Sequence, residues 1–265
     1  MTMIDADNIC DDLQKIRSKS PLIHNITNFV TMDIMANSLL TLGASPIMAH
    51  ASSEIEEVVK AVQGININIG TLEDSWIKAM IKTATIAKDK KIPVVLDPVG
   101  AGFTQYRTQA ALALLDMQVI TVVRGNASEI LSLVSGENIT KGVDNNENDI
   151  NKVADAAKHL SSAFNTIVVI TGQRDYIICN EEVITVEYGH SWMSKVTGMG
   201  CALSSVIAAF LAVNNNYFRA SVNAVSMFGI VGQLVADFSA GPASFKTNFI
   251  DKLHNITSME IKNTL

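Results

Sequence analysis

The sequence predicts an α/β fold, in which a doubly wound, mostly parallel central sheet carries helices on both faces. Short apolar runs alternate along the chain with longer helical patterns, which is typical of such sheets. Several of these runs are apolar throughout, as expected for strands that are covered on both faces. With 48% apolar and 17% charged residues among 265, the chain can bury a sizeable core. We find no repeat and no linker, and we expect a single domain over residues 1–265.

Breakers and capping residues mark the ends of the first helices. Ser20-Pro21 ends an amphipathic helix over residues 3–18, because proline cannot continue a helix. The pair Thr27-Asn28 supplies an N-cap for a helix Phe29–Leu42, which Gly43 closes.

Three strands are expected around the next helix. Residues 22–28 form a short extended piece and an Asn/Thr-rich turn, and Ala44–Ala49 forms a short strand. Either serine of Ser52-Ser53 caps a helix through Val62, whose first-turn glutamates suit the helix dipole. Ile65–Gly70 alternates apolar and polar residues, which predicts a strand with one polar face.

Fully apolar runs define the middle of the sheet. Ile92–Asp97, Val119–Val123 and Thr166–Thr171 are rich in β-branched residues and predict buried strands. Helical patterns lie between the strands, at residues 72–88, after Gly102 to Leu115, from Asn126 to Gly136, and from Asp149 to Phe164, while residues 140–149 form a polar loop.

The C-terminal part is expected to be helical after a hairpin. Tyr176–Cys179 and Val183–Val186 are separated by a short polar turn, which favours a β-hairpin. Small and apolar residues predict buried helices at Ala202–Val213 and Arg219–Phe238, and a last helix starts at Phe245.

Charge and cysteine content exclude several classes of protein. The net charge of −6 argues against a nucleic-acid or anionic-membrane surface, so an anionic ligand would need local cations. Three cysteines without paired spacing favour a reducing compartment over disulfides or a zinc ribbon. The aspartate-rich N-terminus is no signal peptide, and Asn223 and Gln233 interrupt the best apolar run. We therefore expect a cytoplasmic protein.

The ends of the predicted strands nominate a site. In parallel sheets of this kind, ligands bind outside the carboxyl ends of the strands. The residues at those ends are Met48, Gly70, Asp97, Arg124 and Thr171. The stretch Gly198–Cys201, which opens a helix after the hairpin, is expected to join them.

The segment Lys195–Cys201 contains two glycines at a helix start. Such a turn exposes backbone N–H groups, which together with the helix dipole favour a phosphate; alternatively, Gly198 and Gly200 merely begin the helix. The dinucleotide fingerprint fails because its third glycine is replaced by Leu203, and no Gly-Lys-Ser/Thr of a P-loop is present.

Several polar side chains near these strand ends allow two interpretations each. Asp97 can hold Mg²⁺ or can be a turn aspartate before proline. Arg124 is suited to phosphate recognition, and the Thr171 hydroxyl can contact a phosphate. Asn126 and Glu129 lie on one helical face, where they either face a ligand or form a helix cap with glutamate at the third position.

Cys201 lies in the first turn of the predicted helix. The helix dipole at this position is expected to lower the pKa of the thiol. The alternative is a small buried apolar side chain, which is the commoner role of a free cysteine.

Five motifs occur together in register across nearly the whole chain. They are His24-Asn-Ile-Thr-Asn28, Ser45-Pro-Ile-Met-Ala49, Asp97-Pro-Val-Gly-Ala-Gly102, Arg124-Gly-Asn-Ala-Ser-Glu129 and Val196-Thr-Gly-Met-Gly-Cys201. In this order and spacing the chain resembles the hydroxyethylthiazole kinase family, which belongs to the ribokinase-like superfamily. The resemblance implies transfer of the γ-phosphate of ATP to the primary hydroxyl of 4-methyl-5-(2-hydroxyethyl)thiazole, in thiamine salvage.

The resemblance also implies roles for individual residues. Asn28, Met48, Gly70 and Gly198 would line the thiazole site, Arg124 and Thr171 would contact the ATP phosphates, and Asp97, Asn126 and Glu129 would organise Mg²⁺. Gly198, Gly200 and Cys201 would form the anion hole and the site of the attacking hydroxyl. Cys201 stands where the wider superfamily usually has an aspartate as general base, and we expect it to deprotonate the hydroxyl without becoming a covalent nucleophile.

The family resemblance further implies a homotrimer with active sites at subunit interfaces. We expect residues 47–49 to make a subunit contact, because this segment is apolar. Two alternatives stay open at this stage: a related ribokinase-like kinase for hydroxymethylpyrimidine or a sugar, and a non-catalytic vitamin-binding protein on the same scaffold.

Overall fold

A computed structural model describes residues 4–135 and 147–265. In this part of the chain, eight strands form one sheet in the order β2-β1-β3-β4-β5-β6-β7-β8. The strands are β1 Leu22–Ile26, β2 Ser45–Met48, β3 Gly64–Asn68, β4 Val94–Asp97, β5 Val122–Asn126, β6 Ile167–Thr171, β7 Asp175–Cys179 and β8 Glu182–Val186. Strands β1 to β6 pair in parallel, whereas β6-β7 and β7-β8 are antiparallel. The predicted mostly parallel sheet is confirmed.

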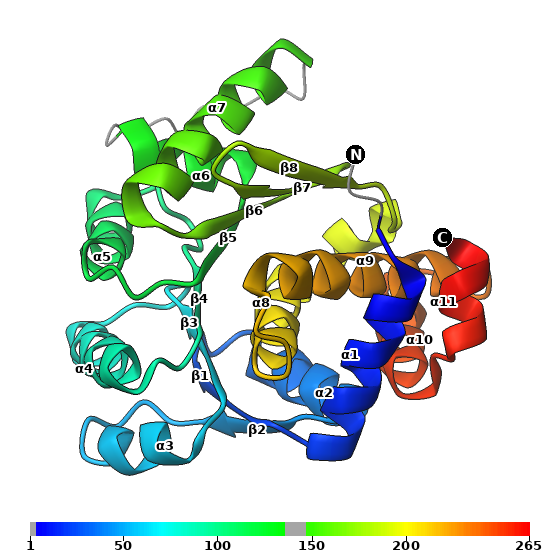
Figure 1. Cartoon of the computed structure of the whole chain (residues 1–265), viewed down its shortest axis with the longest axis horizontal. Helices are drawn as coiled ribbons and strands as arrows, with labels where there is room; N and C mark the ends of the chain where they lie inside the picture. Colours follow the sequence, from blue (N-terminus) through cyan, green and yellow to red (C-terminus); the bar gives the residue numbers. More distant parts are fainter. Residues whose placement is uncertain (1–3, 136–146) are drawn as a thin grey trace.

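Helices cover both faces of this sheet, as predicted (Figure 1). One face carries α3 Ile55–Ala61, α4 Asp74–Lys90, α5 Gln105–Asp116, α6 Ala127–Ser135 and α7 Glu147–Phe164. The other carries α2 Met32–Leu42, α8 Met199–Leu211 and α9 Tyr217–Ala236, with α1 Ala6–Lys19, α10 Pro242–Asn255 and α11 Ser258–Thr264 further out.

Each face of the sheet has its own apolar core. Val95 and Val122 point toward α8 and α9, while their neighbours Val94 and Val123 join the core under α4 and α5. This alternation follows from the two-residue period of a strand. The sequences of the middle strands are apolar throughout because helices cover both faces of these strands.

The polar face predicted for the strand at 65–70 is buried. All five residues of β3 are inaccessible or nearly so, and Asn66 and Asn68 face α8 instead of water. The alternating pattern was correct for a strand, but its polar side lies inside the molecule because a helix from the C-terminal half covers it.

The predicted caps of the second and third helices were wrong. Helix α2 begins at Met32, and Asn28 instead accepts a hydrogen bond from the backbone N–H of Thr31 in the preceding turn. Helix α3 begins at Ile55 with Glu54 at its N-cap, so neither serine of Ser52-Ser53 caps it.

Two further boundaries differ from the sequence prediction. Strand β5 runs from Val122 to Asn126 rather than from 119 to 123, because Arg124 and Asn126 still pair with Val169 and Thr171 of β6. The polar segment predicted as a loop at 140–149 ends earlier, since α7 starts at Glu147; its residues 140–146, and Gly136, lie outside the described residues.

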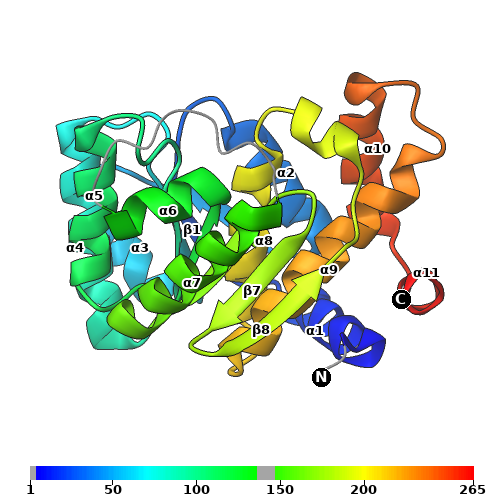
Figure 2. The ribbon, with the colours of Figure 1, turned by 90° about the horizontal axis from the view of Figure 1, so that it is seen from above.

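The C-terminal half contains elements that the sequence patterns did not separate. The single helix expected from Phe245 is two helices, α10 and α11, and a short 3-10 helix, Ser191–Lys195, precedes the glycine turn. The β7–β8 hairpin is confirmed, and it lies along α9 at one end of the sheet (Figure 2).

The helix predicted over Arg219–Phe238 is confirmed as α9, and it contains Asn223 and Gln233, the two polar residues that interrupt its apolar run. It is the one helix in the described residues that is long and apolar enough to cross a membrane by length and composition. Most of it is buried in the core, which accounts for its apolar composition without a membrane.

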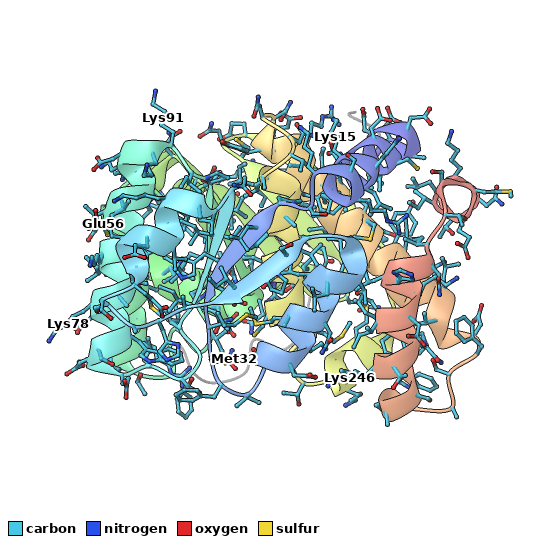
Figure 3. All side chains as sticks on the ribbon, turned by 90° about the horizontal axis from the view of Figure 1, so that it is seen from below. Lys15, Met32, Glu56, Lys78, Lys91 and Lys246 are labelled. Atoms are coloured by element: carbon cyan, nitrogen blue, oxygen red, sulfur yellow. The ribbon has the colours of Figure 1, made fainter. Side chains whose placement is uncertain are left out.

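The two ends of the parallel strands lie at opposite ends of the molecule. Figure 3 shows Lys91, which precedes β4, far from Met32, which follows β1. Residues that follow the strands therefore gather at one end, where the strand-end rule places a ligand site.

Candidate functional site

Four strands present polar side chains to α8 at their carboxyl ends. Asn68 ends β3, Asp97 ends β4, Arg124 lies in β5, and Thr171 ends β6. In register, Asn68 is opposite Asp97. Leu96 is opposite Val123, so the residues that follow them, Asp97 and Arg124, are also neighbours, and the side chains of Asn68, Asp97 and Arg124 share one face. The strand-end rule thus brought Asp97, Arg124 and Thr171 together, as predicted.

A continuous line of polar contacts connects these side chains. Asn68 Nδ2 donates to Asp97 Oδ2 over 2.8 Å, and Arg124 Nη1 lies 3.7 Å from the same oxygen. Arg124 Nη2 donates to Thr171 Oγ1 over 2.5 Å. From α8, Ser204 Oγ donates to Asp97 Oδ2 over 2.9 Å, which ties the helix to the sheet.

The carboxylate of Asp97 is fully buried, and only one of its oxygens is satisfied. Its Oδ1 has no hydrogen-bond partner among the described residues. Burial raises the pKa of Asp97 to about 6, which the Arg124 charge opposes and the Glu129 charge reinforces. This group therefore stabilises the fold most below its ordinary pKa of 3.8, and that contribution is lost as the pH rises through about 6. A buried carboxylate that lowers stability at neutral pH indicates a functional role.

The glycine turn before α8 fits closely against its surroundings. Gly198 has a φ of +88°, and a methyl group there would lie 2.7 Å from Ile34 Cγ2. A methyl group on Gly200 would overlap the guanidinium of Arg124. Both glycines are therefore required by conformation or by space, and the backbone at the start of α8 lies directly against the arginine.

The thiol of Cys201 does not have the lowered pKa that its helix position predicted. Burial, and then the charge of Asp97, raise the pKa of Cys201 to about 11, while Arg124 opposes the shift. Desolvation outweighs the helix dipole here, so Cys201 is a neutral thiol at neutral pH. This correction removes the physical basis for a thiolate acting as general base.

Of the predicted thiazole-site residues, Asn28 and Gly70 lie beside Cys201, whereas Met48 lies on the edge strand of the sheet. Asn28 Nδ2 donates to Cys201 Sγ over 3.5 Å, and Asn28 packs so closely on Gly70 that a methyl group there would lie 2.7 Å from its Cβ. Met48 ends the edge strand β2, where it pairs in register with Asn25, one residue before the end of β1.

Asn126 and Glu129 form the helix cap that was one of their two interpretations. Asn126 Oδ1 accepts from the Glu129 N–H over 2.9 Å, and Glu129 Oε2 accepts from the Asn126 N–H over 2.8 Å. Glu129 Oε1 also accepts from the Gly100 N–H over 2.9 Å. These bonds fix the loop after β4 against α6, and the metal role of both residues stays a prediction.

A cavity of about 660 Å³ opens beside the glycine turn. Arg124 and Thr171 line it on the sheet side and Gly200 on the α8 side, while the chain after β8 supplies the opposite wall, including Tyr188 and His190. Burial raises the pKa of Asp175, which also lines the cavity, to about 6. The volume is that of a small-molecule site.

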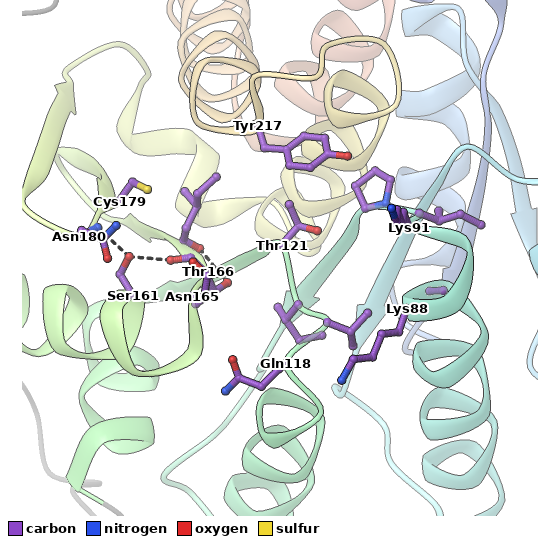
Figure 4. Close-up of a pocket in the computed structure, with 16 residues that line it drawn as sticks. Lys88, Lys91, Gln118, Thr121, Ser161, Asn165, Thr166, Cys179, Asn180 and Tyr217 are labelled. Atoms are coloured by element: carbon purple, nitrogen blue, oxygen red, sulfur yellow. Dashed lines mark hydrogen bonds between the residues drawn. The ribbon is translucent and has the colours of Figure 1, made fainter.

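A second cavity of about 640 Å³ lies at the opposite, amino-terminal ends of β4, β5 and β6 (Figure 4). Two of its polar side chains bond the surrounding backbone: Lys88 Nζ donates to Met117 O, and Ser161 Oγ donates to Thr166 O. We assign no ligand to this cavity.

Sequence reasoning missed Asn68 and Ser204, which both contact Asp97. Two signals were present. Asparagine is uncommon in strands, yet Asn66 and Asn68 alternate along an otherwise apolar one. Ser204 lies three residues after Cys201, on the same helical face.

Mg²⁺ can be tested against these donors. It prefers one or two carboxylates, with substrate phosphates and water completing the shell. The unpartnered Asp97 Oδ1 is a buried oxygen of the required type, and Glu129 is close enough to raise the Asp97 pKa. In the described residues no group of three acidic, histidine or cysteine side chains forms a complete protein cage. The donor set therefore fits an ion that is completed by a phosphorylated substrate.

The fold defines the class of protein: it is an α/β fold of the ribokinase-like type. A ribokinase-like superfamily protein from Enterococcus faecalis has the same fold, with a TM-score of 0.63 at 12% identity over 95% of this chain and 94% of that one. The model of the hydroxyethylthiazole kinase family matches residues 13–259, and the chain belongs to that family.

Individual relatives agree with this assignment. A hydroxyethylthiazole kinase from Syntrophus aciditrophicus is 45% identical over 263 residues, covering 99% of this chain and 97% of the relative. The structure of hydroxyethylthiazole kinase protein from Pyrococcus horikoshii OT3 is similar with a TM-score of 0.89 and 36% identity, over 97% of this chain and 96% of that one.

Proposed function

We propose that this protein transfers the γ-phosphate of ATP to the primary hydroxyl of 4-methyl-5-(2-hydroxyethyl)thiazole, as a single kinase domain in thiamine salvage. Membership of the hydroxyethylthiazole kinase family supports the reaction. The observation that carries the site is the line of contacts from Asn28 through Asn68, Asp97 and Arg124 to Thr171.

The phosphate side of the site is the cavity beside Arg124. Its guanidinium lies against Gly200 and bonds Thr171, so both can meet phosphate oxygens at the start of α8. The backbone N–H groups of Gly200 and Cys201, in the first turn of α8, would stabilise the developing charge of the transferred group, whereas the Met199 N–H bonds Val196 O. Phosphoryl transfer has a loose transition state, for which such fixed charges and dipoles supply most of the stabilisation.

A bound Mg²⁺ would neutralise phosphate oxygens, and Asp97 with Glu129 would hold it. Asp97 is kept rigid for this by Asn68 and Ser204, which occupy its other oxygen. The pKa of about 6 leaves Asp97 ionised at neutral pH.

The acceptor side of the site lies around Cys201. Asn28, Gly70, Gly198 and Met48 would line a small neutral pocket for the thiazole ring. With its raised pKa, the Cys201 thiol can donate a hydrogen bond to the hydroxyl oxygen but is not ionised to accept its proton. Because the nucleophile in a loose transition state loses its proton late, this arrangement is sufficient for positioning.

Assembly and location are also proposals. A homotrimer with shared active sites is consistent with Phe29 and Val30, which are 61% and 68% exposed directly after Asn28. Among the described strands, β2 lies at one edge of the sheet, and native proteins usually cover such an edge. The absence of nucleic-acid or membrane partners and a cytoplasmic location follow from the charge and composition alone.

Product formation tests the proposal. The purified protein is incubated with ATP, Mg²⁺ and the thiazole alcohol, and the monophosphate is detected by mass spectrometry alongside ADP release. ADP release without the thiazole monophosphate would contradict it.

A further inference from the structure

The amide of Asn68 makes four hydrogen bonds at the centre of the site. It is 1% exposed at the end of β3. Its Nδ2 donates to Asp97 Oδ2 over 2.8 Å and to Cys201 Sγ over 3.1 Å. Its Oδ1 accepts from Asn28 Nδ2 over 2.9 Å and from the Gly70 N–H over 3.0 Å.

These partners allow only one orientation of the amide. A flipped amide would place its NH₂ against two other donors, Asn28 Nδ2 and the Gly70 N–H, and its oxygen against the Asp97 carboxylate. All donor and acceptor capacity of the side chain is used in the observed orientation and mispaired in the other. These hydrogen bonds therefore fix the amide of Asn68 in one orientation, unlike that of a surface asparagine.

The groups that Asn68 bonds belong to both halves of the proposed reaction. Asn28 and Cys201 lie on the acceptor side, and Asp97 lies on the phosphate side. We propose that Asn68 is a positioning residue, whose single amide holds the Cys201 sulfur and the Asp97 carboxylate at a fixed separation and anchors Asn28 to both. The meaning of the two sides rests on the proposed function, whereas the contacts themselves do not.

The same strand offers a matched control. Asn66 lies two residues earlier on the same face and is equally buried. Its Nδ2 donates to Asn25 Oδ1 over 3.2 Å and to Ser205 Oγ over 3.1 Å, away from Asp97 and Cys201. Replacing Asn66 therefore removes a comparable buried amide without touching the reacting groups.

Three variants of the full chain separate positioning from packing: Asn68→Leu, Asn68→Asp and Asn66→Leu. Asn68→Asp keeps the shape and the acceptor oxygen but loses both donated hydrogen bonds. Asn68→Asp also places a second carboxyl group beside Asp97, so its loss of activity supports positioning where Asn68→Leu shows a similar loss. Near-normal activity of Asn68→Asp indicates a packing role. Thermal unfolding establishes that each variant is folded, and if Asn68→Leu does not fold, the kcat and the Cys201 labelling of Asn68→Asp together decide the question.

We expect both Asn68 variants to lower kcat by about 10- to 100-fold, the usual effect of removing a group that orients catalytic residues. The KM for ATP should change by less than about threefold, because Asn68 makes no hydrogen bond to Arg124 or Thr171. Asn66→Leu should keep kcat within about threefold of wild type. In a Cys201→Ala background, the effect of Asn68→Leu should shrink, since one of its two positioned partners is gone.

A second readout does not depend on turnover. Labelling of Cys201 by iodoacetamide at one pH is followed by peptide mass spectrometry, with Cys10 and Cys179 as internal references. Asn68→Leu should label more slowly at Cys201, because the donated hydrogen bond from Asn68 favours the thiolate, which is the form that reacts, and Asn66→Leu should label as wild type does.

Three results would overturn the inference. They are an Asn68→Asp enzyme with kcat within about threefold of wild type, an Asn66→Leu enzyme that loses as much kcat as the Asn68 variants, or unchanged Cys201 labelling in Asn68→Leu. If the wild-type protein turns over no thiazole alcohol, the proposed function fails, and the labelling comparison alone still decides the role of Asn68.

Discussion

The positive charge of Arg124 acts on both sides of the site, because it opposes the rise in the pKa of Asp97 and of Cys201. Its guanidinium bonds Thr171, approaches Asp97 and covers Gly200, and its Nε has no partner among the described residues. Its guanidinium lies directly against Gly200 of the glycine turn, and a charge-assisted bond to phosphate is stronger than a neutral one.

Arg124→Ala should therefore weaken the use of ATP. Loss of a charge-assisted phosphate contact costs roughly 1.5–3 kcal/mol, which corresponds to about 10- to 150-fold in kcat/KM for ATP. Steady-state kinetics with varied ATP measures this, and Lys60→Ala, which removes the exposed partner of Glu56 on α3, serves as a charge-matched control. Unchanged KM for ATP together with unchanged kcat in Arg124→Ala would refute the assignment.

Cys201 illustrates how burial can reverse an expectation from local position. The helix start favours a thiolate, but desolvation and Asp97 raise the thiol pKa to about 11. We therefore expect Cys201 to position the substrate hydroxyl as a neutral thiol.

Cys201→Ala should keep measurable activity, with a loss of about 10²-fold or less, because a neutral thiol that only positions the hydroxyl contributes no more than the weakest general bases do. Cys201→Asp should also be active, because aspartate is the usual base at this position in the wider superfamily. Single-turnover and steady-state rates, with ATP binding as a check on folding, make the comparison. Trapping a phosphorylated Cys201, or a folded Cys201→Asp protein that binds ATP but is inactive, would contradict this view.

At the level of elements, the turn before α8 decides where the helix meets the sheet. Gly198 has positive φ and lies against α2 through Ile34 and Thr31, so the conformation and the space both require glycine. The two serines that follow on α8 then reach the strands: Ser204 bonds Asp97, and Ser205 bonds Asn25. The turn therefore places both the exposed N–H groups and the contacts that hold Asp97.

Gly198→Ala should lower the free energy of unfolding by about 1–3 kcal/mol, the cost of a non-glycine residue in a strained backbone region, before any overlap with Ile34 is counted. Gly241→Ala is the matched control, since Gly241 also precedes a helix but has nothing within 4 Å of the added methyl group and has extended backbone. Urea unfolding of both variants measures the difference. Equal stability of the two proteins would show that the turn is not constrained.

Local sequence patterns predicted the elements of the sheet better than they predicted the surroundings of the site residues. Apolar runs and the strand-end rule predicted the sheet and the meeting of Asp97, Arg124 and Thr171, because each depends on local pattern and parallel connectivity. They could not predict that Asn68 faces a buried helix, since the element that covers β3 is α8, from the other half of the chain. Nor could they predict the Cys201 pKa, which depends on how completely distant segments exclude water.

At the scale of the whole molecule, the apolar exposure near the site suggests an assembly. Phe29 packs its ring 4.7 Å from that of Trp76, and Trp76 in turn lies 4.5 Å from His50, so an aromatic group borders the carboxyl edge near Asn28. A partner subunit that covers Phe29 and Val30 would bury this group beside the acceptor pocket.

Light scattering at assay concentration should then give the mass of three 28.6 kDa chains. Val30→Asp should shift the mass toward the monomer and lower activity together, because the charge would lie in the proposed contact. Val183→Asp, at another exposed valine but on the distant hairpin, is the control. An active monomer in the wild-type protein would contradict shared active sites.

The central claim is that this site phosphorylates a thiazole alcohol in preference to other small alcohols. The most direct measurement is a competition, in which equal concentrations of the thiazole alcohol, the pyrimidine alcohol and ribose share one reaction with ATP and Mg²⁺. Product ratios at early times equal ratios of kcat/KM, which is the quantity that defines specificity. We predict that the thiazole monophosphate predominates by at least about 100-fold, as expected when a pocket is shaped for one ring. A predominant pyrimidine or sugar phosphate, or nucleotide binding without any phosphorylated product, would contradict the account.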